Sequence, residues 1–292
     1  MSKGKIIILN GVTSVGKTTL SKALQGQLDE PFYWLTGDAF VEMTPTKFIK
    51  SDFRGTVEKT HMAMAHTAKT FADLGINVIF ETVILAPYQG MLEAFVEILA
   101  NYPVTFVHVT CPLVHQQERE KERGNRPIGS GEAQLSVLNP QDTYDVTVDT
   151  YHDSLAVCGH KIIEAAYKPK ALTAFKKLLL GTSVTVTVDR PLGTCHPTYQ
   201  DMVYPINYGF APGFIAPDGD PQDAYILGVD TAVGTFTGQV IAIICRENDV
   251  EDKWVVAPEG MTFTQADIQA QTHFQEKYFN STIYTGEDVV CN

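Results

Sequence analysis

The sequence predicts a chain of the α/β class with two domains, residues 1–180 and 181–292. In the first, apolar strand patterns alternate with helical patterns, which is typical of a three-layer fold around a parallel sheet. In the second, strand patterns of period two and one late helix predict a small β-barrel-like α+β domain. A length of 292 residues suits two domains better than one.

The elements of the first domain follow from its hydrophobic periodicity. Short apolar runs indicate strands, whereas apolar residues at helical spacing, such as Val57, Met64 and Ala68, indicate helices. The expected strands cover residues 5–9, 32–35, 78–80, 104–109 and 144–148. The expected helices cover residues 17–28, 56–74, 90–100, 113–123 and 152–166, with a further helical stretch at 170–180.

Residues 10–19 join the first strand to the first helix and read Asn-Gly-Val-Thr-Ser-Val-Gly-Lys-Thr-Thr. Gly11, Gly16, Lys17 and Thr18 match G-x-x-x-x-G-K-[ST], the phosphate-binding P-loop, in the strand–loop–helix context that it requires. Backbone N–H groups and the helix N-terminus bind phosphates, the lysine reaches the terminal phosphates, and the threonine hydroxyl holds Mg²⁺. The expected ATP-binding residues are Gly11, Ser14, Gly16, Lys17, Thr18 and Thr19.

Two acidic residues follow expected strands, at the sheet edge where functional groups of parallel sheets collect. Asp38 follows the second strand, where it is a candidate general base for a substrate hydroxyl; the alternative is a cap of the helix beginning at Ala39. Glu81 ends the third strand and is a candidate ligand of Mg²⁺, directly or through water. Its alternative role is an ion pair with a neighbouring Lys or Arg.

Residues 118–127 carry many charges and end at a Gly/Pro loop. Arg123 and Arg126, and less strongly Arg119, suit a mobile lid whose arginines neutralise charge on a transferring phosphoryl group. The alternative is a solvated helix face with i,i+4 ion pairs.

These segments, together with residues 30–45 and 144–150, resemble the chloramphenicol phosphotransferase-like kinases over residues 3–167. The resemblance implies a P-loop kinase that uses ATP to phosphorylate a small-molecule hydroxyl, with Asp38 as the base and Lys17, Arg123 and Arg126 as charge-stabilising groups. It does not identify the acceptor.

The second domain has an acidic turn at residues 216–224, which places Asp218, Asp220 and Asp223 within six residues. Such carboxylates repel one another unless a cation lies between them, and the sequence excludes an EF-hand here. Asp249 and Asp252 form a second acidic pair beside Lys253. The two clusters suit Mg²⁺ ions around a phosphate or diphosphate, and the alternative is a solvated acidic turn.

Residues 189–193, 204–210, 218–224, 249–253 and 273–278 resemble the soluble (family I) inorganic pyrophosphatases. The resemblance implies Mg²⁺ at the five aspartates and phosphate contacts from Tyr208, Lys253 and Tyr278. Three features depart from that family: no Lys or Arg stands between Gly193 and Tyr204, Phe279 replaces an expected lysine, and the second acidic pair is closely spaced. Metal binding is therefore the stronger expectation, and hydrolysis the weaker.

Composition narrows the classes of protein. A net charge of −12 argues against a nucleic-acid or membrane partner. Five scattered cysteines indicate neither a disulfide framework nor a zinc site, and no signal peptide or membrane span is expected, so a cytoplasmic location is expected.

The leading interpretation is an ATP-dependent phosphotransferase fused to a reduced pyrophosphatase-like domain. One alternative makes diphosphate hydrolysis the principal activity and the P-loop domain regulatory. Another makes the second domain a metal- or phosphate-binding, non-catalytic module. A kinase releases ADP and not diphosphate, so a pyrophosphatase-like domain would not remove its product. Nucleotidyl transfer, which releases diphosphate, is therefore a further hypothesis for the first domain.

Overall fold

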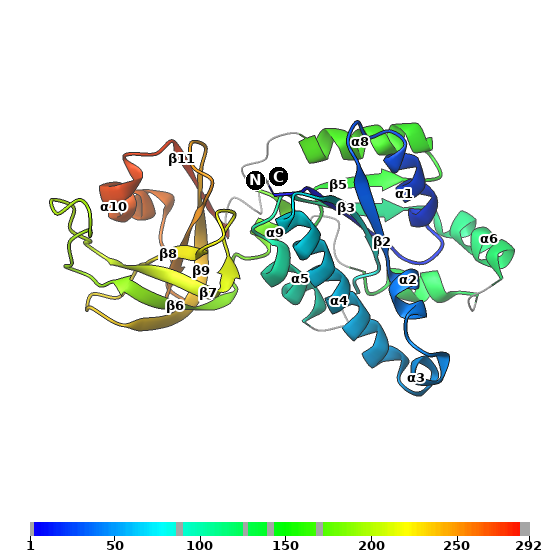
Figure 1. Cartoon of the computed structure of the whole chain (residues 1–292), viewed down its shortest axis with the longest axis horizontal. Coiled ribbons are helices and arrows are strands. Elements are labelled where there is room, and N and C mark those ends of the chain that lie inside the picture. The colour runs from blue at the N-terminus through cyan, green and yellow to red at the C-terminus, as the bar shows by residue number, and fades with distance from the viewer. Residues whose placement is uncertain (1–2, 86–89, 125–127, 139–142, 168–171, 287–292) are drawn as a thin grey trace. The chain divides into compact units, whose positions relative to one another are not determined.

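The computed structural model describes residues 3–85, 90–124, 128–138, 143–167 and 172–286 (Figure 1). The described residues divide into two compact units. Those up to Tyr167, together with Thr173–Phe175, form the first unit, and Leu172 with the residues from Lys176 onward forms the second.

The first unit is built on a parallel five-stranded sheet of order β2-β3-β1-β4-β5, which confirms the predicted α/β fold. The central strand β1 is buried along its whole length, because its side chains are covered on both faces. The strands are β1 (Ile6–Asn10), β2 (Phe32–Thr36), β3 (Asn77–Thr82), β4 (Val104–Thr110) and β5 (Val146–Asp149).

Helices cover both faces of this sheet, with α1 packed against α8 and α4 packed against α5 (Figure 1). They are α1 (Lys17–Gln25), α2 (Gly37–Glu42), α3 (Thr46–Ser51), α4 (Phe53–Asp73), α5 (Met91–Leu99), α6 (Leu113–Arg123), α7 (Ser130–Leu135) and α8 (Leu155–Tyr167). The short helices α3 and α7 lie in segments where the sequence predicted no helix, and α2 was expected only in the alternative that made Asp38 a helix cap. Six residues are too few to show helical periodicity.

The second unit is a mixed sheet of order β10-β8-β7-β6-β9-β11. Strand β9 also pairs with β10, so the sheet closes into a near-ring and confirms the predicted β-barrel-like fold. Its strands are β6 (Ser183–Arg190), β7 (Asn207–Ile215), β8 (Pro221–Ile226), β9 (Thr235–Arg246), β10 (Lys253–Ala257) and β11 (Ser281–Thr285). Helix α10 (Gln265–Glu276) accompanies them, and the short helix α9 (Ala174–Lys177) is divided between the two units at Phe175 and Lys176.

The core of the second unit is rich in aromatic residues. Tyr204, Tyr208 and Tyr225 pack with aliphatic side chains from the barrel and with Ile268 of α10. A capping box between Thr264 and Asp267 fixes the start of α10. In the part of the chain described here, no helix is long and apolar enough to cross a bilayer.

Candidate functional site

The loop between β1 and α1 has the backbone geometry of a phosphate cradle. Ser14 and Gly16 both have a positive φ, 62° and 92°, which lets successive N–H groups turn toward one side. A side chain at Gly16 would also be crowded, because its Cβ would lie 3.3 Å from the Thr150 Oγ1 atom. This explains the glycine on both conformational and steric grounds.

Lys17 begins α1, and its side chain is buried beneath the loop. Its Nζ donates to the carbonyl oxygens of Gly11, at 2.7 Å, and Val12, at 2.9 Å. The ammonium group is therefore held inside the curve of the loop, where phosphate oxygens bind in such motifs.

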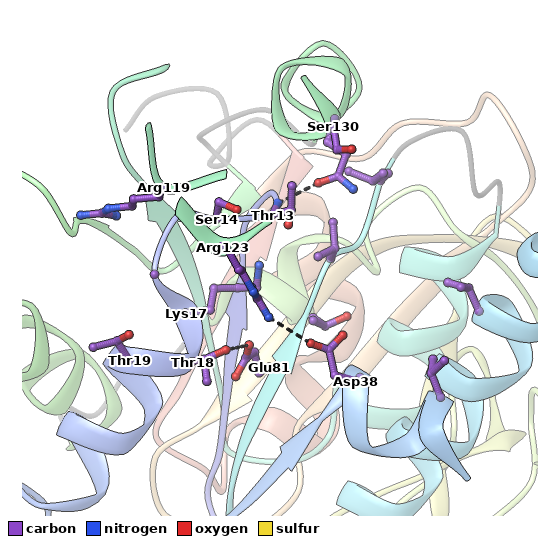
Figure 2. Close-up of a pocket in the computed structure, with 18 of the residues that line it drawn as sticks. Thr13, Ser14, Lys17, Thr18, Thr19, Asp38, Glu81, Arg119, Arg123 and Ser130 are labelled. Carbon is purple, nitrogen blue, oxygen red and sulfur yellow. Dashed lines mark hydrogen bonds and ion pairs between the residues drawn. The ribbon is translucent and has the colours of Figure 1, made fainter. Parts of the chain in front are cut away.

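Thr18, in the first turn of α1, lies beside Glu81 near the carboxyl end of β3 (Figure 2). The Thr18 hydroxyl donates to Glu81 Oε1 at 2.6 Å, and Trp34 Nε1 donates to Glu81 Oε2 at 3.2 Å. Among the residues described, no Lys or Arg pairs with Glu81, so the ion-pair alternative finds no support. A hydroxyl and a carboxylate side by side fit the oxygen ligands that Mg²⁺ prefers.

Asp38 is in the first turn of α2, but it is not the cap of that helix. Thr36 is the cap, since its side chain accepts a hydrogen bond from the Ala39 N–H. The Asp38 carboxylate is instead exposed and lies 3.5 Å from Arg123 Nη2, as Figure 2 shows. The capping alternative is therefore wrong.

A cavity of about 1170 Å³ brings these groups together. Its lining includes both the P-loop and the residues that follow β2 and β3. The sequence-predicted residues that line it are Ser14, Gly16, Lys17, Thr18, Thr19, Asp38, Glu81, Arg119 and Arg123. Gly11, which is also buried, contributes through its carbonyl contact with Lys17.

The expected lid arginines differ in position. Arg123 reaches Asp38, whereas Arg119 donates to the hydroxyl and the carbonyl oxygen of Thr150, at 3.0 and 3.2 Å. Arg119 thus lies toward the β5 side of the cavity, where Gly16 and Leu155 also line it. Arg126 lies outside the described residues.

A hydrogen-bond network that the sequence did not predict joins the P-loop to α6 and α7. Gln116 donates to the Thr13 carbonyl oxygen at 2.9 Å, and the Thr13 N–H donates to Gln134 at 2.8 Å. The buried Glu120 accepts from the N–H groups of Gly129 and Gly131. The charge run of α6 concealed these contacts, because its sequence resembles a solvated helix face.

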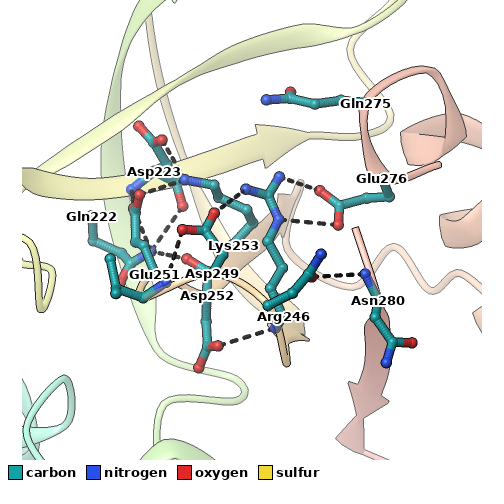
Figure 3. Close-up of polar contacts among 12 residues, drawn as sticks. Gln222, Asp223, Arg246, Asp249, Glu251, Asp252, Lys253, Gln275, Glu276 and Asn280 are labelled. Carbon is teal, nitrogen blue, oxygen red and sulfur yellow. Dashed lines mark hydrogen bonds and ion pairs between the residues drawn. The ribbon is translucent and has the colours of Figure 1, made fainter. Parts of the chain in front are cut away.

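In the second unit, Asp223 is the centre of a half-buried polar cluster (Figure 3). Tyr208 OH and Lys253 Nζ both donate to Asp223 Oδ2, each at 2.6 Å. Burial raises the pKa of the Tyr208 hydroxyl, and the Asp223 carboxylate raises it further, so Tyr208 remains a donor. Two of the three residues expected to contact phosphate, Tyr208 and Lys253, therefore bind a carboxylate within the protein.

The second acidic pair is also occupied by basic side chains. Arg246, which is labelled with Asp249 in Figure 3, donates from Nη1 to Asp249 Oδ2 at 2.9 Å. Lys176 pairs with Asp252. Burial opposes ionisation of Asp249, but the hydrogen bond from Arg246 keeps its pKa below the ordinary value.

The remaining predicted residues of this unit, Asp218, Asp220 and Tyr278, are exposed. In the described part of the chain, no three His, Cys, Asp or Glu residues group closely enough to hold a metal ion. As arranged, the five aspartates do not fit a Mg²⁺ site.

Sequence reasoning also missed Glu251. Residues 251 and 253 lie on the same side of the chain entering β10, and their side chains form an ion pair. Burial raises the pKa of Glu251 to about 7, with Lys253 opposing the shift and Asp223 adding to it. Glu251, and not Asp252, is therefore the carboxylate that accompanies Asp223 and Lys253. The period of two along a strand could have identified it.

Each of the two units is similar to known proteins. A family profile described as chloramphenicol phosphotransferase-like protein matches residues 4–167, more than half of the chain. The chain belongs to the chloramphenicol phosphotransferase-like family. This membership covers the unit that holds the P-loop, Asp38 and Arg123, and a kinase-like domain of this family implies ATP binding.

The C-terminal region of this chloramphenicol phosphotransferase-like chain resembles inorganic pyrophosphatases. It is 32% identical over 104 residues to an inorganic pyrophosphatase of Saccharolobus solfataricus, covering 30% of this chain and 55% of the relative. With that of Aeropyrum pernix it shares 40% identity over 79 residues, covering 26% of this chain and 42% of the relative. The chain thus spans about half the length of the curated relatives it matches.

Solved structures similar to this member of the chloramphenicol phosphotransferase-like family also fall into two groups. An APS kinase of Mycobacterium tuberculosis aligns with a TM-score of 0.45 at 16% identity, over 57% of this chain and all of that one. An inorganic pyrophosphatase of Ehrlichia chaffeensis aligns with a TM-score of 0.30 at 17% identity, over 37% of this chain and 88% of that one.

Proposed function

We propose that the first unit transfers the γ-phosphoryl group of ATP to a hydroxyl of a small molecule. The observation that carries the proposal is the shared cavity, in which the P-loop groups Lys17 and Thr18 and the Asp38–Arg123 pair line one space. Phosphoryl transfer requires this combination of phosphate positioning, positive charge and a carboxylate near the acceptor.

In this proposal Asp38 accepts the proton of the acceptor hydroxyl as its oxygen attacks the γ-phosphorus. The bond from the γ-phosphorus to the β,γ-bridging oxygen breaks, and ADP leaves. Lys17 and Arg123 stabilise the negative charge of the transferring group. Thr18 and Glu81 would hold Mg²⁺, which supplies further positive charge between the phosphates when it is bound.

The test is a screen of hydroxylated metabolites and antibiotics with ATP, in which the nucleotide product is identified. We expect ADP, formed in amounts equal to the phosphorylated acceptor. Release of AMP and diphosphate would contradict the proposal and indicate nucleotidyl transfer. No acceptor-dependent turnover across the screen would also count against it.

Glu81→Gln should raise the Mg²⁺ concentration needed for half-maximal turnover by about 10-fold or more, because a charged ligand is lost. The amide oxygen of glutamine can still accept the Thr18 hydrogen bond, so the loop should keep its shape. Steady-state rates measured against Mg²⁺ concentration test this expectation. Glu118→Gln, at an exposed position on α6, is the control and should leave the Mg²⁺ dependence unchanged. An unaltered Mg²⁺ dependence in Glu81→Gln would remove Glu81 from the metal site.

For the second unit we propose a non-catalytic binding role, in which it does not hydrolyse diphosphate. The pyrophosphatase similarity makes hydrolysis of diphosphate the other candidate, but Lys253, Arg246 and Lys176 already pair with the carboxylates that would bind metal. With diphosphate and Mg²⁺, the full chain should release no phosphate above a buffer control. Release that is lost in Asp220→Asn would overturn this proposal and establish a diphosphatase.

A further inference from the structure

His61 is a buried histidine of α4 whose side chain lines the cavity of the first unit. Only 7% of the residue is exposed, and its Nδ1 lies 2.8 Å from the Val57 carbonyl oxygen, one helical turn back. A carbonyl oxygen can only accept, so this contact places a proton on Nδ1. Burial lowers the pKa of His61, and the charge of Lys17 lowers it further, which favours the neutral ring. Nε2 then carries a lone pair.

His61 Nε2 lies close to Gly37, at the end of the cavity where Asp38 also lies. A methyl group placed on Gly37, the residue before Asp38, would be 3.9 Å from His61 Nε2. Within the described part of the chain, no protein partner is found for Nε2. Its open side is therefore the cavity.

The surrounding wall is otherwise apolar. Helices α2 and α4 contribute six lining residues, and Asp38 and His61 are the ones with polar side chains; the others are Gly37, Val41, Phe53 and Val57. An apolar wall with few placed polar atoms is typical of a small-molecule site, in which the polar atoms fix the orientation of the ligand.

His108 shows that burial alone does not lead to this conclusion. Its Nδ1 also lacks a partner in the described residues, but its ring is stacked on Tyr144 and is absent from the cavity lining. His61 differs because its unpaired nitrogen opens onto a space large enough for a ligand.

We propose that His61 binds the acceptor substrate by accepting a hydrogen bond from a second O–H or N–H group of the molecule whose first hydroxyl faces Asp38. The inference rests on the proposed phosphoryl transfer, because it takes the Asp38 end of the cavity as the acceptor end. It adds a requirement on the substrate class: the acceptor carries two hydrogen-bond donors, one that is phosphorylated and one that His61 recognises.

A site built to pair with a substrate donor discriminates strongly against molecules that lack it, because its own polar atom is then left unsatisfied. His61→Leu should therefore raise the KM for the acceptor found in the screen by about 10- to 100-fold, with the KM for ATP unchanged. In His61→Gln the amide oxygen can take the place of Nε2, so the acceptor KM should stay within about 3-fold of that of the natural protein. The matched control is His66→Leu on the exposed side of the same helix, which should change neither constant.

An acceptor analogue with its second donor methylated completes the cycle. In the natural protein, the analogue should have a higher KM than the parent acceptor. In His61→Leu, the analogue and the parent acceptor should have similar KM values. If methylation raised the acceptor KM by the same factor in the natural protein and in His61→Leu, the hydrogen bond from the acceptor to His61 would be contradicted. An unchanged acceptor KM in His61→Leu would contradict it as well. Retained ATP binding shows that the variant is folded.

A second measurement does not depend on turnover. In the full chain labelled with ¹⁵N-histidine, the imidazole nitrogens of His61, assigned with His61→Gln, should show a protonated Nδ1 and an unprotonated Nε2 near neutral pH. A charged ring or the opposite tautomer would overturn the inference about His61 even if the kinase assay succeeds. Failure of the screen with the expected tautomer would instead locate the error in the proposed function.

Discussion

Asp38→Asn should lower acceptor-dependent ATP turnover by about 10²- to 10⁴-fold, the usual contribution of a general base. The amide has the shape of the carboxylate but cannot take up the proton of the acceptor hydroxyl. It also removes the negative charge 3.5 Å from Arg123 Nη2. ATP binding should persist, because Lys17 and the P-loop are unchanged. Rates and ATP dissociation constants measured on the same preparation separate the two effects.

The control for this variant is Glu42→Gln, which removes a carboxylate from the same short helix. Glu42 is exposed and does not line the cavity, so this change should leave turnover within about 2-fold of the natural value. If Asp38→Asn also keeps most of its turnover, Asp38 is not the base.

Arg246→Met should cost the second unit about 3–5 kcal/mol in free energy of unfolding, as expected when one partner of a buried ion pair is removed. Only 2% of the Arg246 side chain is exposed, and its Nε and Nη2 donate to Glu276 at 3.2 and 2.5 Å. Methionine fills much of the space but leaves the Glu276 carboxylate buried without a cation. Tyr225 would remain its main donor, at 2.6 Å.

Urea unfolding of the full chain can measure this cost in a Trp34→Phe background, because Trp254 is then the one tryptophan and reports on the second unit. The control is Arg190→Met, whose partner Asp189 is 41% exposed, and it should cost about 1 kcal/mol or less. Adding Glu276→Gln to Arg246→Met should recover part of the loss, since no buried charge then remains unpaired. A cost for Arg246→Met as small as that of the control would show that the ion pair contributes little.

The sequence predicted the fold of the first unit well because local signals agree with the tertiary structure. A buried strand, the P-loop and an amphipathic helix succeed one another at the start of the chain, and each carries its own pattern. In the second unit β7, β8 and β11 were not predicted. β7 and β8 pair with each other along neighbouring parts of the chain, but they lie in a segment crowded with Gly, Pro and aromatic residues that hide the period-two pattern.

The candidate site shows the same division. The residues of known motifs, such as Lys17 and Thr18, could be assigned from spacing, because spacing fixes their local geometry. The role of His61 could not, since a helix pattern does not reveal which buried polar atom faces a cavity. Nor could the pairing of Asp249 with Arg246, because ion pairs depend on which side chains the folded chain brings together. The predicted Mg²⁺ cluster rested on the spacing of the carboxylates and on the resemblance to inorganic pyrophosphatases, and neither reveals which basic side chains pair with those carboxylates.

The hydrogen bonds that tie Thr13 to Gln116 and Gln134 have an entropic consequence. They tie the P-loop to α6 and to the C-terminal part of α7 through the protein's own groups. Most of the loss of conformational freedom is therefore incurred during folding, not when the ligand arrives. A preorganised loop of this kind keeps more of its contact energy as net affinity. It also makes the folding of this segment a determinant of how tightly the chain holds phosphate.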